Sequence, residues 1–182
     1  MTQENKTKTA YLAGGCFWCL EAVFLRVKGV LSSVSGYAGG QTPEPTYEEV
    51  STGMTGYAET VKLEYDPAVI AYDDLLSIFF YVHDPTSLNR QGNDAGTQYR
   101  STVFYETEAQ KTAAEEFIAS RQASGEYKKP IVTTIEPLVK FYRAEEYHQR
   151  YFEKNPDKAY CQLVIVPKVE KFKAAYKKFF VV

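Results

Sequence analysis

The chain has 182 residues, of which 45% are hydrophobic and 24% are charged, as in an ordinary soluble globular domain. Its 21 Lys and Arg residues against 23 Asp and Glu residues give a net charge of −2, which argues against nucleic-acid binding and against a basic membrane patch. The longest apolar stretch, residues 75–82, is too short to span a bilayer, and the polar start at 1–8 is unlike a signal peptide. Three cysteines are too few for a disulfide-stapled secreted domain, so we expect a cytoplasmic protein. The length is that of a single domain, which we expect to cover residues 1–182.

A cysteine behind a glycine pair opens the first predicted helix. A short strand is expected over 9–13, and Gly14 and Gly15 separate it from Cys16. The apolar residues that follow at helical spacing are Phe17, Leu20, Phe24 and Val27. This helix is expected to stop at Gly29. Free backbone N–H groups and the macrodipole at a helix N-terminus favour a thiolate, so Cys16 is a candidate nucleophile.

Three other interpretations of this cysteine pattern have to be weighed. A lone cysteine is most often a small buried apolar residue. Together, Cys16 and Cys19 form a Cys-x-x-Cys pair, which is typical of thioredoxin-type redox sites and of zinc sites. A zinc site would require a second pair of ligands. The other candidate ligands, Cys161, His83 and His148, are isolated in the sequence, so we predict no metal. A thioredoxin-type site fits less well, because the two residues between the cysteines, Phe17 and Trp18, are bulky and no thioredoxin-like order of elements follows.

The remaining elements alternate imperfectly between strands and helices. Further strands are predicted at 30–37, 58–65, 98–105 and 131–135. Further helices are predicted at 74–81, 108–123, 144–152 and 169–180, with Asp73 and Thr107 as N-caps of the first two. Two loops, 36–47 and 89–96, are rich in glycine and long enough to be functional. Adjacent strands favour an α+β fold, a two-layer sandwich with a mixed sheet, over a doubly wound parallel one.

Several separated motifs resemble those of one enzyme family. They are Gly15-Cys16-Phe17-Trp18, Gly36-Tyr37-Ala38-Gly39-Gly40, Pro45-Thr46-Tyr47, Gly56-Tyr57-Ala58-Glu59, His83-Asp84-Pro85-Thr86, the segment 91–100, Glu145-Glu146-Tyr147-His148-Gln149 and Asn155-Pro156. Over about residues 10–165 the chain resembles the A-type peptide methionine sulfoxide reductases. The resemblance implies a ferredoxin-like core with the catalytic cysteine at the N-terminus of the first helix. It also implies reduction of the S epimer of methionine sulfoxide, free or in proteins, which repairs oxidative damage.

The resemblance assigns roles to individual residues. Cys16 matches the nucleophile, and Glu59 matches the general acid that protonates the sulfoxide oxygen. A glutamate in that role must be partly desolvated to hold its proton near neutral pH. The other matching residues are Tyr47 and Tyr99 for the oxygen, Phe17 and Trp18 for the S-methyl pocket, and Asp94 for a water near the site.

Recycling requires a second thiol, because attack leaves a sulfenic acid on Cys16 that must be converted to a disulfide. By resemblance, Cys161 in the C-terminal segment 153–182 is the favoured recycling cysteine, and thioredoxin is the electron donor, with no bound cofactor. The chain departs from many relatives in carrying Ala159 and Gln162 rather than glycines beside Cys161. Cys19 stays open as an alternative, because positions i and i+3 share a helix face, and a scheme using all three thiols is a further hypothesis.

Two other functions are weighed against this one. A thiol–disulfide oxidoreductase using Cys16 and Cys19 directly on protein disulfides would keep its activity in Glu59→Gln, whereas the reductase would lose most of it. A peptide-binding module with an aromatic pocket for methionine would bind tightly without turnover. The clustered cysteines argue against the binding module.

Overall fold

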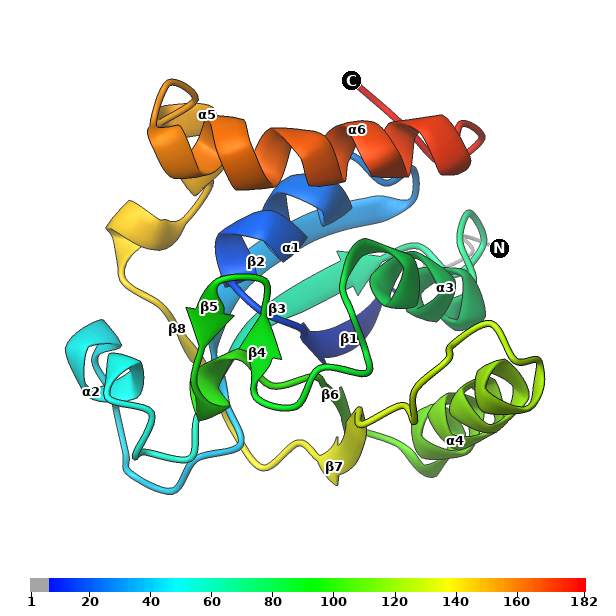
Figure 1. The fold of residues 1–182 in the computed structure, drawn as a ribbon, viewed down its shortest axis with the longest axis horizontal. Helices are drawn as coiled ribbons and strands as arrows, with labels where there is room; N and C mark the ends of the chain where they lie inside the picture. The colour runs from blue at the N-terminus through cyan, green and yellow to red at the C-terminus, as the bar shows by residue number, and fades with distance from the viewer. Residues whose placement is uncertain (1–6) are drawn as a thin grey trace, which may run out of the picture.

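The protein, described here by a computed structural model over residues 7–182, is built on a six-stranded sheet (Figure 1). Most of the polar segment 1–8 lies outside the described residues. The strands of the sheet are β1 Lys8–Ala13, β2 Val30–Ala38, β3 Ala58–Tyr65, β6 Thr102–Tyr105, β7 Thr134–Pro137 and β8 Phe141–Arg143. Their order is β7-β6-β1-β3-β2-β8, in which only β6 and β7 pair in parallel. The predicted mixed sheet is therefore confirmed.

The four central strands explain the ferredoxin-like core. They stand in the order β6-β1-β3-β2 and are antiparallel throughout. Helix α1, Phe17–Phe24, connects β1 to β2, and helix α3, Tyr72–Val82, lies between β3 and β6. This is the β-α-β-β-α-β arrangement of the ferredoxin-like fold, so that expectation is confirmed. Because β1 and β3 are neighbours at the centre, the residue that follows β1 and the first residues of β3 meet at one end of the sheet.

The helical layer covers one face of the sheet and buries the main core. Helix α6, Val166–Ala175, packs against both α1 and α3, and Figure 1 shows it running across α1. Helix α4, Glu108–Ala123, packs beside α3 and β6. The fully buried residues of this core include Leu12, Phe17, Leu20, Phe24, Val61, Leu63, Leu75 and Phe79. Each such side chain contributes roughly 1.5–3 kcal/mol to folding through removal of apolar surface from water.

Local signals in the sequence predict several boundaries well. Strand β3 begins and ends at the predicted residues, and α4 follows the Thr107 cap, whose side chain accepts a hydrogen bond from the backbone N–H of Gln110. Asp73 is not the cap of α3, and that prediction is wrong. The N-cap is Ala71, whose N–H donates to the carboxylate of Asp74 at 3.3 Å.

Other predicted elements are shorter, displaced or broken. The expected strand 98–105 starts only at Thr102, because a 3-10 turn occupies Thr97–Tyr99. The strand expected at 131–135 is displaced to β7. The helix expected over 144–152 is wrong: a 3-10 turn at Glu146–His148 and helix α5, Tyr151–Lys154, are separated by the left-handed residue Arg150. The C-terminal helix ends at Ala175 rather than at residue 180, and a π-helical turn, Cys161–Ile165, precedes it.

The long loops contain short elements that the sequence analysis missed. Helix α2, Tyr47–Ser51, ends the first loop, with Thr46 and Glu49 forming a reciprocal capping box. The second loop folds as a small hairpin of β4, Arg90–Gln91, and β5, Asp94–Ala95. Within residues 7–182, no helix is long and apolar enough to cross a membrane.

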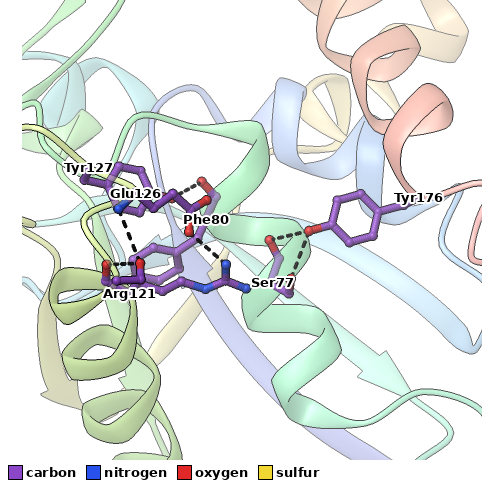
Figure 2. A network of polar contacts seen from close by, with 7 residues as sticks. Ser77, Phe80, Arg121, Glu126, Tyr127 and Tyr176 are labelled. Carbon is purple, nitrogen blue, oxygen red and sulfur yellow. Dashed lines mark hydrogen bonds and ion pairs between the residues drawn. The ribbon is translucent and has the colours of Figure 1, made fainter.

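A polar network fastens α6 and α4 to α3, as Figure 2 shows. The hydroxyl of Tyr176, at the end of α6, lies 2.9 Å from Ser77 Oγ and donates to the Ser77 carbonyl at 3.2 Å. Arg121 of α4 donates to the same Ser77 hydroxyl at 3.4 Å and pairs with Glu126 at 2.8 Å. Tyr127 donates to the carbonyl of Phe80 at 3.1 Å. This network therefore fixes α6, and with it the preceding π-helical turn that carries Cys161.

Tyr176→Phe is expected to lower the free energy of unfolding by about 1 kcal/mol, because it removes the hydroxyl that bridges α6 to α3 and leaves the ring in place. Denaturant unfolding of the purified variant measures this change. Tyr105→Phe is a matched control, since the Tyr105 hydroxyl makes no hydrogen bond within the described part of the chain. An equal loss in both variants would contradict a bridging role for Tyr176.

Candidate active site

Cys16 lies at the N-terminal end of α1, directly after the turn that leaves β1. It is the N-cap residue of the helix, and only 7% of its surface is exposed. The turn needs glycine at position 15, because its φ is +89° and an added Cβ would lie 2.7 Å from the Gln91 side chain. The strand–turn–helix setting expected for Cys16 is therefore present in the fold.

Glu59 meets this helix terminus from the neighbouring strand. It is the second residue of β3, it is 2% exposed, and its Oε2 accepts a hydrogen bond of 3.0 Å from the backbone N–H of Phe17. Burial raises the pKa of Glu59 to about 8, although the Phe17 N–H opposes this shift. Glu59 therefore holds a proton at neutral pH, and the helix terminus stabilises the carboxylate that remains when the proton leaves.

A cavity of about 180 Å³ joins the predicted site residues. Its lining residues are Cys16, Phe17, Trp18, Tyr47, Glu59, Asp94, Tyr99 and Tyr160. Burial and the nearby Glu59 raise the pKa values of both Tyr47 and Tyr99, so their hydroxyls stay protonated and remain hydrogen-bond donors. Sequence reasoning named seven of the eight lining residues from four separate segments of the chain, and the fold brings these seven together.

Trp18 is held in a fixed orientation by two residues of the chain's C-terminal part. Its ring stacks on Tyr151, with centroids 3.7 Å apart and planes within 5°. Its Nε1 donates a hydrogen bond of 3.1 Å to Nδ1 of the buried His148. Phe17, the other aromatic residue of the pair, is fully buried and also belongs to the main core. Trp18 is therefore the more accessible wall of the cavity.

Tyr47 is positioned through its own backbone. Its N–H donates to Oε2 of Glu145 at 3.0 Å, and the other oxygen of Glu145 accepts from the Tyr37 hydroxyl at 2.9 Å. Helix α2 begins at Tyr47 behind the Thr46 cap, which sets the direction of its side chain. Glu145 thus links β2, α2 and the 3-10 turn around the cavity.

Cys16 and Cys19 interact directly, and their pKa values move in opposite directions. Burial raises the pKa of the Cys16 thiol, and the neighbouring Cys19 and Glu59 raise it further. The interaction with Cys16 is the largest influence on Cys19 and lowers its pKa to about 7, despite burial. Burial and the two neighbouring groups therefore act against the thiolate form of Cys16, whereas the helix N-terminus favours it.

Tyr160 connects the thiols to Asp94. Its hydroxyl donates to Oδ2 of Asp94 at 2.7 Å and lies 3.7 Å from Sγ of Cys19. Its ring meets Trp18 edge-on at 5.8 Å. Asp94, at the start of β5, is thus tied to the residue directly before Cys161.

Cys161 is not among the residues that line the cavity. It begins the π-helical turn, which packs against α1, and it is fully buried. Burial raises its pKa, and the next influence is the charge of Cys19. Cys19 is therefore the thiol next to both others, and the three cysteines are free in the structure.

His83, one of the two histidines considered as zinc ligands, hydrogen-bonds through both ring nitrogens, to the Phe79 carbonyl and the Ser101 hydroxyl. The other, His148, accepts from Trp18 at Nδ1, and its buried Nε2 has no hydrogen-bond partner among the described residues. Among the residues that the structure describes, no group of three or more His, Cys, Asp or Glu side chains is arranged to hold a metal ion.

Comparisons with known proteins agree with this geometry. The family model "Peptide methionine sulfoxide reductase" matches residues 8–179. The chain belongs to this family. A family member from Natronomonas pharaonis, peptide methionine sulfoxide reductase MsrA, is 57% identical over 170 residues, which cover 93% of this chain and 96% of that relative.

Solved structures give the same assignment. Mxr1 from Saccharomyces cerevisiae in reduced form superposes with a TM-score of 0.79 at 37% identity, covering 88% of this chain and 92% of that one. Mxr1 from the same organism in complex with Trx2 superposes with a TM-score of 0.57 at 28% identity, covering 83% and 88% of the two chains. The α+β fold and the peptide methionine sulfoxide reductase family are thus established together.

Sequence reasoning missed three residues that shape the cavity. Tyr160 lies beside Cys161 in the C-terminal segment and has no signal of its own in the sequence. Glu145 and His148 belong to one family motif, and their residue types alone do not indicate that they hold Tyr47 and Trp18. The signal that pointed to them was the motif itself, since a Glu and a His three residues apart lie on one side of a single turn.

Proposed function

We propose that this protein reduces methionine S-sulfoxide, free or within proteins, to methionine, with Cys16 as nucleophile and Glu59 as general acid. The observation that carries the proposal is the cavity itself, in which a cysteine at a helix N-terminus faces a buried, protonated glutamate. A sulfoxide is attacked at sulfur by a thiol, and its oxygen becomes a better leaving group on protonation. Both groups that this chemistry needs line one small cavity.

The first step transfers oxygen from substrate to enzyme. Sγ of Cys16 attacks the sulfoxide sulfur while Glu59 gives its proton to the oxygen. The attack forms a bond between Sγ and the substrate sulfur, and the protonated oxygen leaves that sulfur as hydroxide. Hydroxide then attacks Sγ, the sulfur–sulfur bond breaks, methionine leaves, and Cys16 carries a sulfenic acid. The thiol proton of Cys16 restores the proton on Glu59, so no proton is gained or lost overall. A raised Cys16 pKa in the resting state fits this scheme, because both protons stay in the site until substrate arrives.

The other lining residues hold the substrate. The hydroxyls of Tyr47 and Tyr99 donate to the sulfoxide oxygen as negative charge develops there. Trp18 and Phe17 form the apolar wall for the S-methyl group, and aromatic rings also make favourable contacts with sulfur. Asp94 accepts from Tyr160 and closes the opposite side of the cavity, where it holds a water near the site.

The second step converts the sulfenic acid to a disulfide. A second thiol attacks the Cys16 sulfur, water leaves, and an S–S bond forms. Cys19 touches Cys16, so we propose that it resolves the sulfenic acid first. Cys161 then attacks Cys19, the Cys16–Cys19 bond breaks and releases the Cys16 thiol, and the resulting Cys19–Cys161 disulfide is presented to a thioredoxin. The complex of Mxr1 with Trx2 supports a thioredoxin as electron donor. This cycle suits the reducing cytoplasm.

Single-turnover reduction tests the proposal. Pre-reduced protein, mixed with methionine S-sulfoxide and no added reductant, is expected to form one methionine per molecule with loss of two thiols in the first turnover, and up to one more methionine because the relay returns Cys16 to the free thiol. Amino-acid analysis and thiol titration measure the two quantities. The R epimer is the matched control substrate and should give no methionine. Absence of methionine from the fully reduced protein with the S epimer would contradict the proposed function.

A further inference from the structure

A groove adjoins the active-site cavity and has no part in the reaction scheme. It has a volume of about 530 Å³ and is lined by the β4–β5 hairpin, the end of α3 and the segment 160–171, so we call it the α6 groove. Asp94 and Tyr160 line both the groove and the cavity. Both residues are half-buried, so the rim that they share is reached from solvent. The charged residues of the groove are Asp84, Asp94, Lys168 and Lys171.

The cavity has room for the side chain of methionine sulfoxide but not for the residues on either side of it, since its volume is about 180 Å³. When the substrate is a polypeptide, its backbone therefore crosses the rim of the cavity. An extended chain advances about 3.3–3.6 Å per residue, so the next one or two residues of the substrate stay near the rim. The α6 groove begins at that rim and is large enough to take one of their side chains.

Lys168 brings a positive charge without a partner into the α6 groove. It lies on α6, its side chain is half-buried, and its ammonium group has no hydrogen bond or ion pair within residues 7–182. A half-buried ammonium group has lost part of its hydration, and a carboxylate that pairs with it replaces what was lost. The groove therefore favours a ligand with an acidic group.

The other charged groups of the α6 groove are engaged by the protein. Asp94 accepts a hydrogen bond from the Tyr160 hydroxyl at 2.7 Å, and Asp84 accepts one from the backbone N–H two residues further on at 2.9 Å. Lys171 donates to a backbone carbonyl of α3 at 3.3 Å and forms no ion pair within the described part of the chain. Lys168 is thus the charged group that is left to bind a ligand, with Lys171 adding positive charge beside it.

We propose that the α6 groove is a subsite for polypeptide substrates, in which Lys168 binds an acidic side chain one or two residues away from methionine sulfoxide. The inference rests on the proposed function, because that function supplies the substrate, and it adds a preference for acidic sequence around the oxidised methionine. Lys168 contacts the substrate away from the reacting atoms. It therefore changes the affinity for a peptide and not the chemistry at Cys16.

Three peptides test the subsite, with glutamate, glutamine or lysine at the two positions on either side of methionine S-sulfoxide. The concentration that gives half of the maximal first-turnover rate is expected to be about two- to fivefold lower for the glutamate peptide than for the glutamine peptide, the size of one exposed ion pair. Lys168→Gln should remove this difference, and Lys168→Glu should give the lysine peptide the advantage. The first turnover is measured because the charge of Lys168 also acts on Cys19, although less than Cys16 does, and a change there affects only recycling.

Lys173→Gln is the matched control. Lys173 lies on the same helix, but its ammonium group lies over the Phe180 ring, 5.4 Å from the centroid, and it does not line the α6 groove. This variant should keep the wild-type preference. Equal half-saturating concentrations for the three peptides in the wild type would overturn the inference, and so would a preference for the glutamate peptide that persists in Lys168→Gln.

Binding without turnover separates this inference from the proposed function. Cys16→Ser cannot form the sulfenic acid, so calorimetric titration of this variant with the same peptides measures affinity alone. The glutamate peptide should bind most tightly, and the addition of Lys168→Gln should remove its advantage. If the wild-type protein reduced none of the peptides while Cys16→Ser kept this order, the proposed function would fail and the subsite would stand. Equal affinities for the three peptides would overturn the subsite whatever the activity.

Discussion

Glu59→Gln is expected to slow the first chemical step by about 10²–10⁴-fold, because glutamine keeps the shape of the side chain but cannot give a proton to the sulfoxide oxygen. Binding should change little, since the amide still accepts the hydrogen bond from the Phe17 N–H. Single-turnover formation of methionine, followed by rapid quench, measures the step. Glu64→Gln on the same strand is the matched control, because Glu64 bonds to Lys62 and Ser32 away from the cavity. An equally fast first step in Glu59→Gln would contradict the role of Glu59.

The pH dependence follows from the raised pKa of Glu59. The acid form is present below about pH 8 and is lost as the pH rises through that value. The wild-type first step should therefore fall by about tenfold per pH unit on the alkaline side. Glu59→Gln should lack this fall, although its rate is low at every pH. A wild-type profile that stays flat above pH 9 would contradict a protonated Glu59 as the acid.

The same pKa has a consequence for stability. The folded state holds the Glu59 proton up to about pH 8, whereas an ordinary glutamate loses it near 4.5. Folding therefore takes up a proton between these values, and stability falls as the pH rises through this window, by about 1.4 kcal/mol per pH unit. Glu59→Gln should remove this loss, so its advantage over wild type in denaturant unfolding grows from pH 4.5 to pH 7. The burial that keeps Glu59 protonated for catalysis thus lowers the stability of the folded protein at neutral pH.

Glu59→Gln also separates two chemistries that Cys16 and Cys19 permit. A thiol–disulfide oxidoreductase attacks a sulfur whose leaving group is already a thiolate, so it needs no acid at position 59. If the protein were such an oxidoreductase, disulfide reduction by the variant would continue at the wild-type rate. The burial of Cys16 inside a cavity of about 180 Å³ argues against that function, since a side chain fits there and a protein disulfide does not. We therefore expect Glu59→Gln to lose sulfoxide reduction.

Regular elements with strong local signals were predictable from the sequence. Alternation over 58–65 gave the limits of β3, and the Thr107 cap gave the start of α4. Elements that form through tertiary contacts were not predictable from the sequence. Strand β8 has only three residues and forms because β2 offers an edge with Gly36, where a side chain would collide with Phe141. The helix expected over 144–152 breaks at Arg150, whose left-handed conformation has no signal in its residue type.

The candidate site was predictable only through the family motifs. A glutamate on a strand is usually solvated, and nothing near Glu59 in the sequence indicates its burial. Tyr160 acts through a contact across the fold, with Asp94, so no periodicity points to it. The pKa of Cys16 shows the same limit, because the sequence places it at a helix terminus but does not show how deeply the terminus is buried.

Cys19→Ser and Cys161→Ser are expected to stop recycling at different stages. Both variants should still form one methionine per molecule, since Cys16 is intact. Cys19→Ser should retain a long-lived sulfenic acid on Cys16, because the thiol that touches Cys16 is gone. Cys161→Ser should form a Cys16–Cys19 disulfide, but steady-state turnover with thioredoxin should fall by at least about tenfold, since that disulfide is buried. Trapping with dimedone and mass mapping of alkylated peptides identify the species.

The position of Cys161 favours an order in which Cys19 reacts with Cys16 first and Cys161 reacts with Cys19 afterwards. Cys161 is fully buried, it is not among the residues that line the cavity, and the π-helical turn that carries it is fastened through α6 and Tyr176 to α3. The preceding residue, Tyr160, is bound through its hydroxyl to Asp94, so a movement of Cys161 toward Cys16 has to disturb these contacts. If Cys19→Ser formed a Cys16–Cys161 disulfide as fast as the wild type forms its first disulfide, the relay would be contradicted. If the relay holds, only formation of the last disulfide requires the π-helical turn to open, and such turns are frequent at functional sites.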